Sequence, residues 1–261
     1  MKLRRFVFFL SCLPGCACWL ACPLQGEAPR VAPDTTLTLE FPGLPPMQDG
    51  LPAACEVHIP KSYEAGRPVP LLVWFGGGKG SQHVAGAAGV VDFDRFVVVA
   101  LPYPGGKLPR LAAQDGDVAR HWEFQQVMMR KVTELIPNID PRVRVVAGTS
   151  SGAHLIGSGL SLEWPGFVDY FTLFVLHEGG VAASNKYPGA KGRRLLVIWG
   201  EESPAFKWQL LFNWRIGRAD ARVSYRSIPG AGHGLTPRGR EMIRTWIEER
   251  MSEIPAPKVS P

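Results

Sequence analysis

Six short apolar runs, separated by turn-forming residues, constrain the fold of this sequence more than any other feature. The runs are rich in Val, Leu and Phe, and their hydrophobicity is continuous rather than alternating. Strands of this kind are buried on both faces, which is typical of a parallel sheet with helices on each side. The six runs are residues 71–75, 96–101, 143–147, 170–176, 195–199 and, more weakly, 223–228.

Two further strands and two helices complete the pattern. Residues 36–41 and 55–59 alternate between apolar and polar side chains, which predicts antiparallel edge strands. A helix is expected from about Asp117 to just before Pro137, and another after Thr236, which is a good N-cap. Strands that alternate with helices predict an α/β fold, with a mostly parallel central sheet and helices on both faces.

The first 22 residues have the layout of a signal peptide. Lys2, Arg4 and Arg5 precede an apolar stretch at 6–13, which is too short to span a bilayer as a helix. We therefore predict an exported protein that is periplasmic, secreted or lipid-anchored to the cell envelope. The expected divisions of the chain are a signal peptide at 1–22, a flexible linker at 23–34, the folded domain at 35–253 and a flexible tail at 254–261.

Cysteine usage bears on the same N-terminal segment. Four of the five cysteines lie within residues 1–22, so a disulfide framework is excluded. Cys16 and Cys22 each follow residues that look like an imperfect bacterial lipoprotein cleavage site, after which the cysteine would carry lipid. Lipid anchoring and plain secretion both stay open, and membrane contact is expected only through such an anchor.

The charge of the chain argues against a nucleic-acid partner. The formal net charge is +6, but three of the cations fall within residues 1–22, which carry no acid, so the remainder has +3. A charge of that size is too small to indicate a phosphate backbone as the partner. With 46% hydrophobic and 20% charged residues, the chain is able to bury one core of α/β size.

A Gly-x-Ser-x-Gly motif at 148–152 follows the third apolar run and precedes a helix-like segment. A strand that leads straight into a helix needs a sharp turn, and glycines two positions to either side of Ser150 give it room. Such a turn lifts the Ser150 hydroxyl clear of the sheet and places the Ser151 amide where it can stabilise an oxyanion. Ser150 is therefore the predicted nucleophile.

A serine nucleophile needs a general base, and His233 is the candidate. It lies in the Gly-rich loop 230–234, between the last predicted strand and the last helix. The other histidines precede the serine, lie in predicted helices or follow a middle strand; they are His58, His83, His121, His154 and His177. Glycines at 76–78 end a strand and let backbone amides approach a substrate, so Gly77 is expected to be a second oxyanion donor.

Together these segments resemble the α/β-hydrolase superfamily, and within it the secreted esterases related to polyhydroxybutyrate depolymerases and feruloyl esterases. The matching text includes Val-His-Ile-Pro-Lys-Ser-Tyr at 57–63 and Ile-Asp-Pro-Arg-Val at 139–143. The resemblance implies a Ser-His-acid triad that acts by acyl transfer, with no metal and no organic cofactor.

The sequence departs from this family at two positions. Phe75 stands where the oxyanion strand usually has a histidine, and Ser203 stands where an aspartate usually completes the triad. Among the nearby acids, Glu202 is favoured as the triad acid. The alternatives are Glu201, Glu178 and, more distantly, Asp220.

The predicted function is hydrolysis of a small-molecule or polymer carboxylic ester by a serine esterase, through an acyl-enzyme intermediate. The segment from Leu176 to Leu195 is short and is interrupted by Gly and Pro, so it leaves no room for a large lid. An open cleft is therefore expected. Two alternatives stay open: a catalytically degenerate envelope binding protein on the same fold, and a peptidase. Four aromatic residues are expected either to line the pocket or to be core: Trp74, Phe75, Tyr103 and Trp122.

Overall fold

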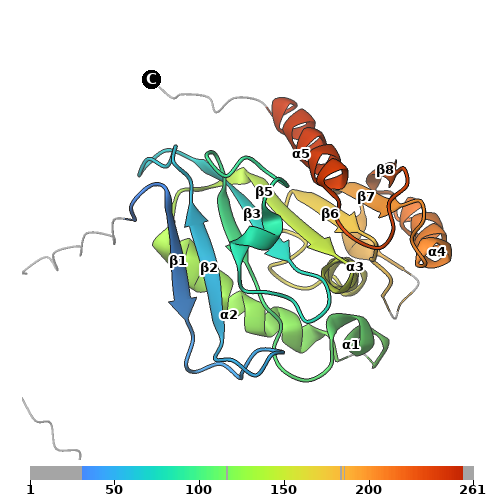
Figure 1. Cartoon of the computed structure of the whole chain (residues 1–261), viewed down its shortest axis with the longest axis horizontal. Helices are drawn as coiled ribbons and strands as arrows, with labels where there is room; N and C mark the ends of the chain where they lie inside the picture. The colour runs from blue at the N-terminus through green and yellow to red at the C-terminus, as the bar shows by residue number, and fades with distance from the viewer. Residues whose placement is uncertain (1–30, 116, 183, 185, 255–261) are drawn as a thin grey trace, which may run out of the picture.

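One mixed sheet of eight strands forms the centre of the molecule (Figure 1). The computed structural model describes residues 31–254 except 116, 183 and 185. The strands lie side by side in the order β1-β2-β4-β3-β5-β6-β7-β8. Their bounds are β1 Thr35–Glu40, β2 Ala54–Ile59, β3 Val69–Phe75, β4 Val97–Ala100, β5 Ile139–Thr149, β6 Leu173–His177, β7 Arg194–Gly200 and β8 Arg222–Ile228.

The sheet is mostly parallel, as predicted. The β1–β2 and β2–β4 pairs are antiparallel, and every other neighbouring pair is parallel. The eight predicted strands are all present, although β2 lies one position inside the edge formed by β1. β6 begins later than predicted, because the amides of Tyr170 and Phe171 hydrogen-bond to the Phe167 carbonyl in a turn (3.2 Å each).

Helices cover both faces of the sheet, which confirms the predicted architecture. Successive residues of a strand point to opposite faces. Val73 and Phe75 accordingly belong to one apolar cluster with side chains of α2, α3 and α4, whereas Leu72 and Trp74 belong to a second cluster with those of α5. The bounds are α1 Pro109–Asp115, α2 Ala119–Leu135, α3 Ser151–Leu162, α4 Phe206–Gly217 and α5 Pro237–Ser252.

Two helices begin and end close to the predicted positions. α2 buries Phe124, Met128 and Val132 on one face. α5 begins after Thr236, whose hydroxyl accepts a hydrogen bond from the Gly239 amide (3.1 Å) and so caps the helix. α1 and α4 have no counterpart in the prediction, because the spacing of their apolar residues marks no single buried face.

The two ends of the chain are described only in part. The predicted signal peptide and the linker up to residue 30 lie outside the described residues, as does the tail from residue 255. Residues 32–34 of the linker are exposed, and the Ile254 amide hydrogen-bonds to the Met251 carbonyl (3.0 Å) at the end of α5. Within the described ranges, no helix is long and apolar enough to cross a membrane.

Candidate active site

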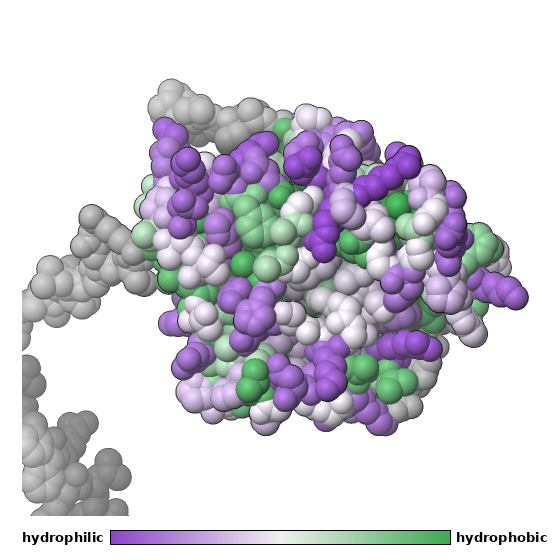
Figure 2. All heavy atoms as spheres, in the orientation of Figure 1, coloured by the Kyte–Doolittle hydropathy of each residue, from purple (hydrophilic) through white to green (hydrophobic). Residues whose placement is uncertain are grey.

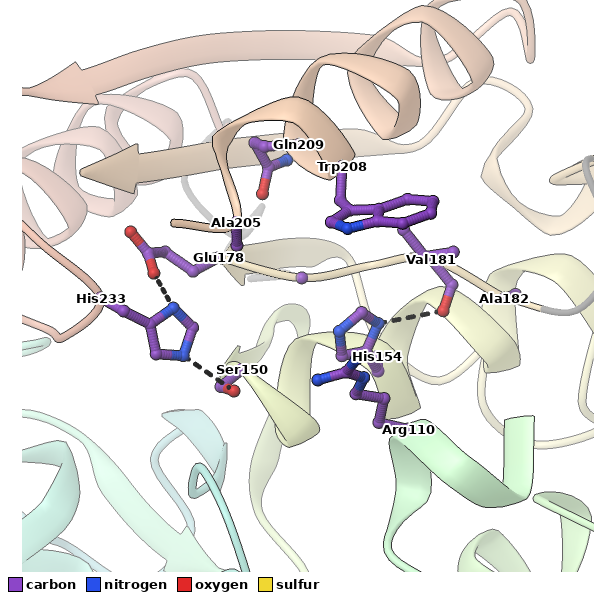
Figure 3. A pocket seen from close by; sticks show the side chains of 11 residues that line it. Arg110, Ser150, His154, Glu178, Val181, Ala182, Ala205, Trp208, Gln209 and His233 are labelled. Atoms are coloured by element: carbon purple, nitrogen blue, oxygen red, sulfur yellow. Dashed lines mark hydrogen bonds and ion pairs between the residues drawn. The ribbon is translucent and has the colours of Figure 1, made fainter. Parts of the chain in front are cut away.

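A sharp turn joins β5 to α3 and carries Ser150 at its tip (Figure 3). Ser150 has φ 51° and ψ −110°, a backbone conformation that is rare for a residue with a side chain. The turn is tight, because a Cβ on Gly148 would lie 2.5 Å from the Gly152 backbone and a Cβ on Gly152 would collide with the Phe75 carbonyl oxygen. The Ser150 amide donates to the His177 carbonyl (2.9 Å), which fixes the turn against β6.

His233 lies opposite Ser150, in the loop between β8 and α5. Its Nε2 atom is 3.1 Å from the Ser150 Oγ atom. At this distance the imidazole is able to accept the hydroxyl proton directly. The structure therefore brings together the two residues that the sequence predicted as nucleophile and base.

Glu178 contacts His233 on the side opposite Ser150, which gives a series of three residues, Ser150, His233 and Glu178. It follows β6 with φ 53°, its side chain is buried, and its Oε2 atom pairs with His233 Nδ1 (Figure 3). The Gly200 amide donates to Oε1 (2.7 Å) and the Ser203 hydroxyl donates to Oε2 (3.0 Å). These donors satisfy a carboxylate that has no access to water, and the carboxylate in turn orients the imidazole so that Nε2 faces the serine.

This arrangement corrects the preference for Glu202 as the partner of His233. Glu202 and Glu201 follow β7 and have exposed side chains, and the Glu201 carboxylate accepts a hydrogen bond from Ser227 (2.7 Å). Asp220 precedes β8, so it lies at the amino end of the strand whose carboxyl end leads to His233. The alternative Glu178 is the acid that the structure places against the imidazole.

The two residues predicted as oxyanion donors, Gly77 and Ser151, lie close to Ser150. A Cβ on Gly77 would be 3.4 Å from Thr149 Cγ2 and 3.6 Å from Ser150 Cβ, so the Gly77 backbone runs close to the serine. Ser151 is the first residue of α3, and the first amides of a helix have no carbonyl partner within it. The role of both amides as oxyanion donors therefore stays a prediction.

Two further histidines lie near Ser150 and His233: His154 is half-buried and His177 is buried. Burial lowers the pKa of His154 to about 4 and that of His177 to about 3, so both imidazoles are neutral at pH 7. His154 Nδ1 donates a hydrogen bond to the Val181 carbonyl oxygen (3.0 Å), and His177 Nδ1 is 2.7 Å from Thr149 Oγ1. Among the described residues, no group of three or more His, Cys, Asp or Glu is placed to hold a metal ion.

Ser150, His233 and Glu178 line a pocket of about 200 Å³ (Figure 3). The rest of its wall comes from α1, α3, α4 and the segment after β6, and includes Arg110, His154, Val181, Trp208 and Gln209. The described residues between β6 and β7 form one short helix, Pro188–Ala190, in place of a large lid. The pocket is thus bordered by elements that lie far apart in the sequence.

Arg110, Trp208 and Gln209 are pocket residues that the sequence analysis missed, because α1 and α4 were not recognised. The available signals were prolines: Pro109 is the first residue of α1, and Pro204 stands just before α4. The aromatic residues considered for the pocket are core instead, each at most 4% exposed; they are Trp74, Phe75, Tyr103 and Trp122.

No known family model matches the chain, and no curated protein matches it. Solved structures do match. A Bacillus cereus carboxylesterase is 19% identical at a TM-score of 0.56, over 72% of this chain and 90% of that one. A Rhizomucor miehei esterase is 15% identical at a TM-score of 0.60, over 85% of each chain.

A third solved structure is a putative dipeptidyl aminopeptidase IV from Bacteroides ovatus, which is 13% identical at a TM-score of 0.58. The match covers 84% of this chain and 36% of that one. At such identities the likeness concerns the fold, and the finer resemblance to polyhydroxybutyrate depolymerases and feruloyl esterases stays a prediction. The chain has the α/β-hydrolase fold. This follows from the mostly parallel sheet, from the serine turn after β5 and from the folds of these neighbours.

Proposed function

We propose that this protein is a serine esterase that hydrolyses carboxylic esters through an acyl-enzyme intermediate. The observation that carries the proposal is the continuous series from Ser150 through His233 to Glu178, at the wall of a pocket. The esterases among the structural neighbours support ester hydrolysis at the level of the fold. The proposed substrates are small-molecule or polymer esters.

In the proposed mechanism, the Ser150 oxygen attacks the ester carbonyl while His233 Nε2 takes the hydroxyl proton. The Gly77 and Ser151 amides hold the oxyanion that forms, and Glu178 stabilises the imidazolium. When the tetrahedral intermediate collapses, the bond to the alcohol breaks and His233 protonates the departing oxygen. A water molecule, deprotonated by His233, then attacks the acyl-enzyme; the bond between the acyl carbon and the Ser150 oxygen breaks, His233 returns the proton to that oxygen, and the carboxylic acid is released.

The two alternatives differ in what supports them. A degenerate binding protein was considered because Ser203 replaces the usual aspartate. Since Glu178 pairs with His233 and is a candidate acid, the missing aspartate no longer argues for a degenerate site. A peptidase would use the same nucleophile and base, and one neighbour carries a peptidase name. Matched ester and amide substrates separate the esterase from the peptidase.

The proposal is tested by treating the purified protein with a fluorophosphonate and locating the modified peptide by mass spectrometry. We expect label on Ser150, none in Ser150→Ala, and a loss of p-nitrophenyl ester turnover in that variant on the order of 10⁵-fold. Folded protein that takes no label and cleaves no ester would refute the esterase. Faster cleavage of the amide than of the matched ester would favour the peptidase.

We further propose that residues 1–22 direct export and that the mature protein is periplasmic, secreted or anchored by lipid. The basic start and short apolar stretch of that segment support this. Mass spectrometry of the mature N-terminus tests it: lipid on Cys16 or Cys22 would show an anchor, an unmodified new N-terminus would show secretion, and retention of Met1 inside the cell would contradict both.

A further inference from the structure

The outer surface of α4 is unusual for a helix of a folded domain. Four of the eight large hydrophobic side chains that are exposed in the described chain lie on it: Phe206 at 38%, Trp208 at 64%, Leu210 at 48% and Trp214 at 60% exposure. We call these residues, together with Lys207, Arg215 and Arg218, the α4 surface. It lies at the right-hand edge of the molecule, where hydrophobic and hydrophilic residues stand side by side (Figures 1 and 2).

Packing within the molecule does not account for these side chains. α4 buries only a narrow stripe, formed by Gln209, Phe212 and Ile216. The remaining large apolar residues point away from that stripe, and a single domain gains nothing from exposing two indole rings to water. Several large apolar residues exposed on one helix indicate a contact with another surface.

The net charge of this region favours an anionic partner. Lys207, Arg215 and Arg218 are the charged residues between 206 and 218, so the helix carries no acid. Next to it lies a groove of about 800 Å³ where Trp214, Arg215 and Arg218 face Lys186 and Lys191. The groove also holds Glu163 and Asp220, and four cations outnumber these two acids. The Arg218 guanidinium lies 5.1 Å from the centre of the Trp214 ring.

We propose that the α4 surface docks on an anionic lipid surface. A helix with Trp, Phe and Leu beside Lys and Arg matches the boundary between headgroups and acyl chains, where indole rings partition and cations meet phosphate. Long basic side chains lay their stems along the apolar layer and keep their charged ends among the headgroups. The groove with Lys186 and Lys191 gives further cations to the same headgroups.

Docking in this way also orients the pocket. Trp208 belongs both to the α4 surface and to the wall of the pocket that holds Ser150, so the pocket mouth would face the lipid. This orientation is the part of the inference that rests on the proposed esterase function. The docking itself needs neither Ser150 nor turnover.

The other possible occupant is a second copy of this chain. A symmetric contact places the same patch on both copies, so Lys207, Arg215 and Arg218 of one would face the same cations of the other. Like charges brought together in an interface disfavour it. An anionic bilayer carries the opposite charge, so it does not repel these cations.

The test is co-sedimentation of the purified chain with phosphatidylcholine vesicles, with and without about 30% phosphatidylglycerol. We expect at least tenfold more binding to the anionic vesicles and a loss of that preference at high salt. Lys207→Gln and Arg218→Gln should each weaken this binding roughly fivefold. Trp214→Ala should weaken binding several-fold, because an interfacial anchor is lost.

Matched controls keep the test specific. Arg95→Gln and Leu51→Ala remove an exposed cation and an exposed apolar residue elsewhere and should bind vesicles like the parent protein, as should Ser150→Ala. Because Trp214 and Arg218 lie outside the pocket, their variants should hydrolyse a soluble ester at the parental rate, which also shows that they fold. The N-terminus is kept the same throughout, so its own contribution to binding is constant.

The outcomes separate docking from catalysis. Equal binding to both vesicle types, or binding unaffected by the α4 variants, would overturn the inference. So would an oligomer in solution that Trp214→Ala converts to monomer, since the surface would then join copies of the chain. Vesicle binding without ester hydrolysis would leave docking intact and remove the proposed function alone.

Discussion

Two loops at the same edge of the sheet each carry a glutamate after a buried strand, and they differ in what surrounds it. Glu178, after β6, is buried and meets the Gly200 amide, the Ser203 hydroxyl and His233. Glu202, after β7, is exposed. The loop after β7 thus supplies hydrogen-bond donors to the acid of the loop after β6, although it carries glutamates of its own.

This difference shows what makes a carboxylate the partner of a histidine. Burial and nearby hydrogen-bond donors decide it, and the position of the carboxylate in the sequence does not. A buried carboxylate without donors would be protonated or would destabilise the fold. Ser203 occupies the position where the resembled family usually has an aspartate, and here it donates to the acid instead. The site keeps a similar arrangement of groups with the carboxylate moved by one strand.

Among the variants that test this comparison, Glu178→Gln has the largest expected effect. An amide at this position no longer favours the Nε2-acceptor tautomer and does not stabilise the imidazolium, so kcat for a p-nitrophenyl ester should fall roughly 10³–10⁴-fold. Glu202→Gln is the matched control and should stay within about twofold of the parent. If the two variants lost activity equally, the contrast between the loops would be wrong.

Gly200→Ala tests the contact between the loop after β7 and the loop that carries His233. The new Cβ would collide with the Ala231 and Gly232 carbonyl oxygens, and neither backbone atom is free to rotate away. We expect the free energy of unfolding in urea to drop by about 3 kcal/mol. Gly232→Ala has open space around its Cβ and should cost under about 1 kcal/mol; equal losses would show that the loops are not in contact.

Acid should weaken the end of β6 through His177. Burial lowers the pKa of this imidazole to about 3, against 6.5 for a histidine exposed to water. Above pH 6.5 neither the folded nor the unfolded chain binds the proton; as the pH falls, the unfolded chain binds it first, so stability is lost. Between pH 7 and pH 5 the loss should be about 2 kcal/mol. Because His154, whose pKa burial also lowers, adds its own loss, the His177 share is measured as the difference between the parent protein and His177→Gln in urea titrations at both pH values.

Ser203→Ala is expected to have the smallest effect. It removes one hydrogen bond to Glu178 and leaves the Gly200 amide and His233 in place, so kcat should fall about tenfold or less. Ser203→Thr keeps a hydroxyl and should recover part of the loss. A drop as large as that of Glu178→Gln would mean that the serine does more than support the acid.

The sequence predicted those parts of the molecule that depend on local pattern. The eight strands follow from apolar runs, and the serine turn follows from glycines two residues to either side of Ser150. The pairing of Ser150 with His233 was also predictable, because the carboxyl ends of parallel strands meet at one edge of the sheet. These inferences need only neighbouring residues and the rules of sheet topology.

The identity of the acid was not predictable in this way. Glu178 meets His233 because of its own positive φ and because Gly200 and Ser203 approach from the next strand, and none of these contacts leaves a trace in the local sequence. α4 was missed for a related reason. Its apolar residues are spread around the helix instead of along one face, since most of them are exposed.

The tight packing of α3 against the sheet has a consequence for how this chain evolves. Gly148, Gly152 and Gly157 each face backbone atoms that a Cβ would strike; at Gly157 the obstacle is the Gly180 carbonyl. A backbone atom does not become smaller through a second mutation, so no compensating change elsewhere makes room. Homologues should therefore drift freely over most of the surface while these three glycines stay the same, and they would be the positions by which to align even distant lineages of the chain.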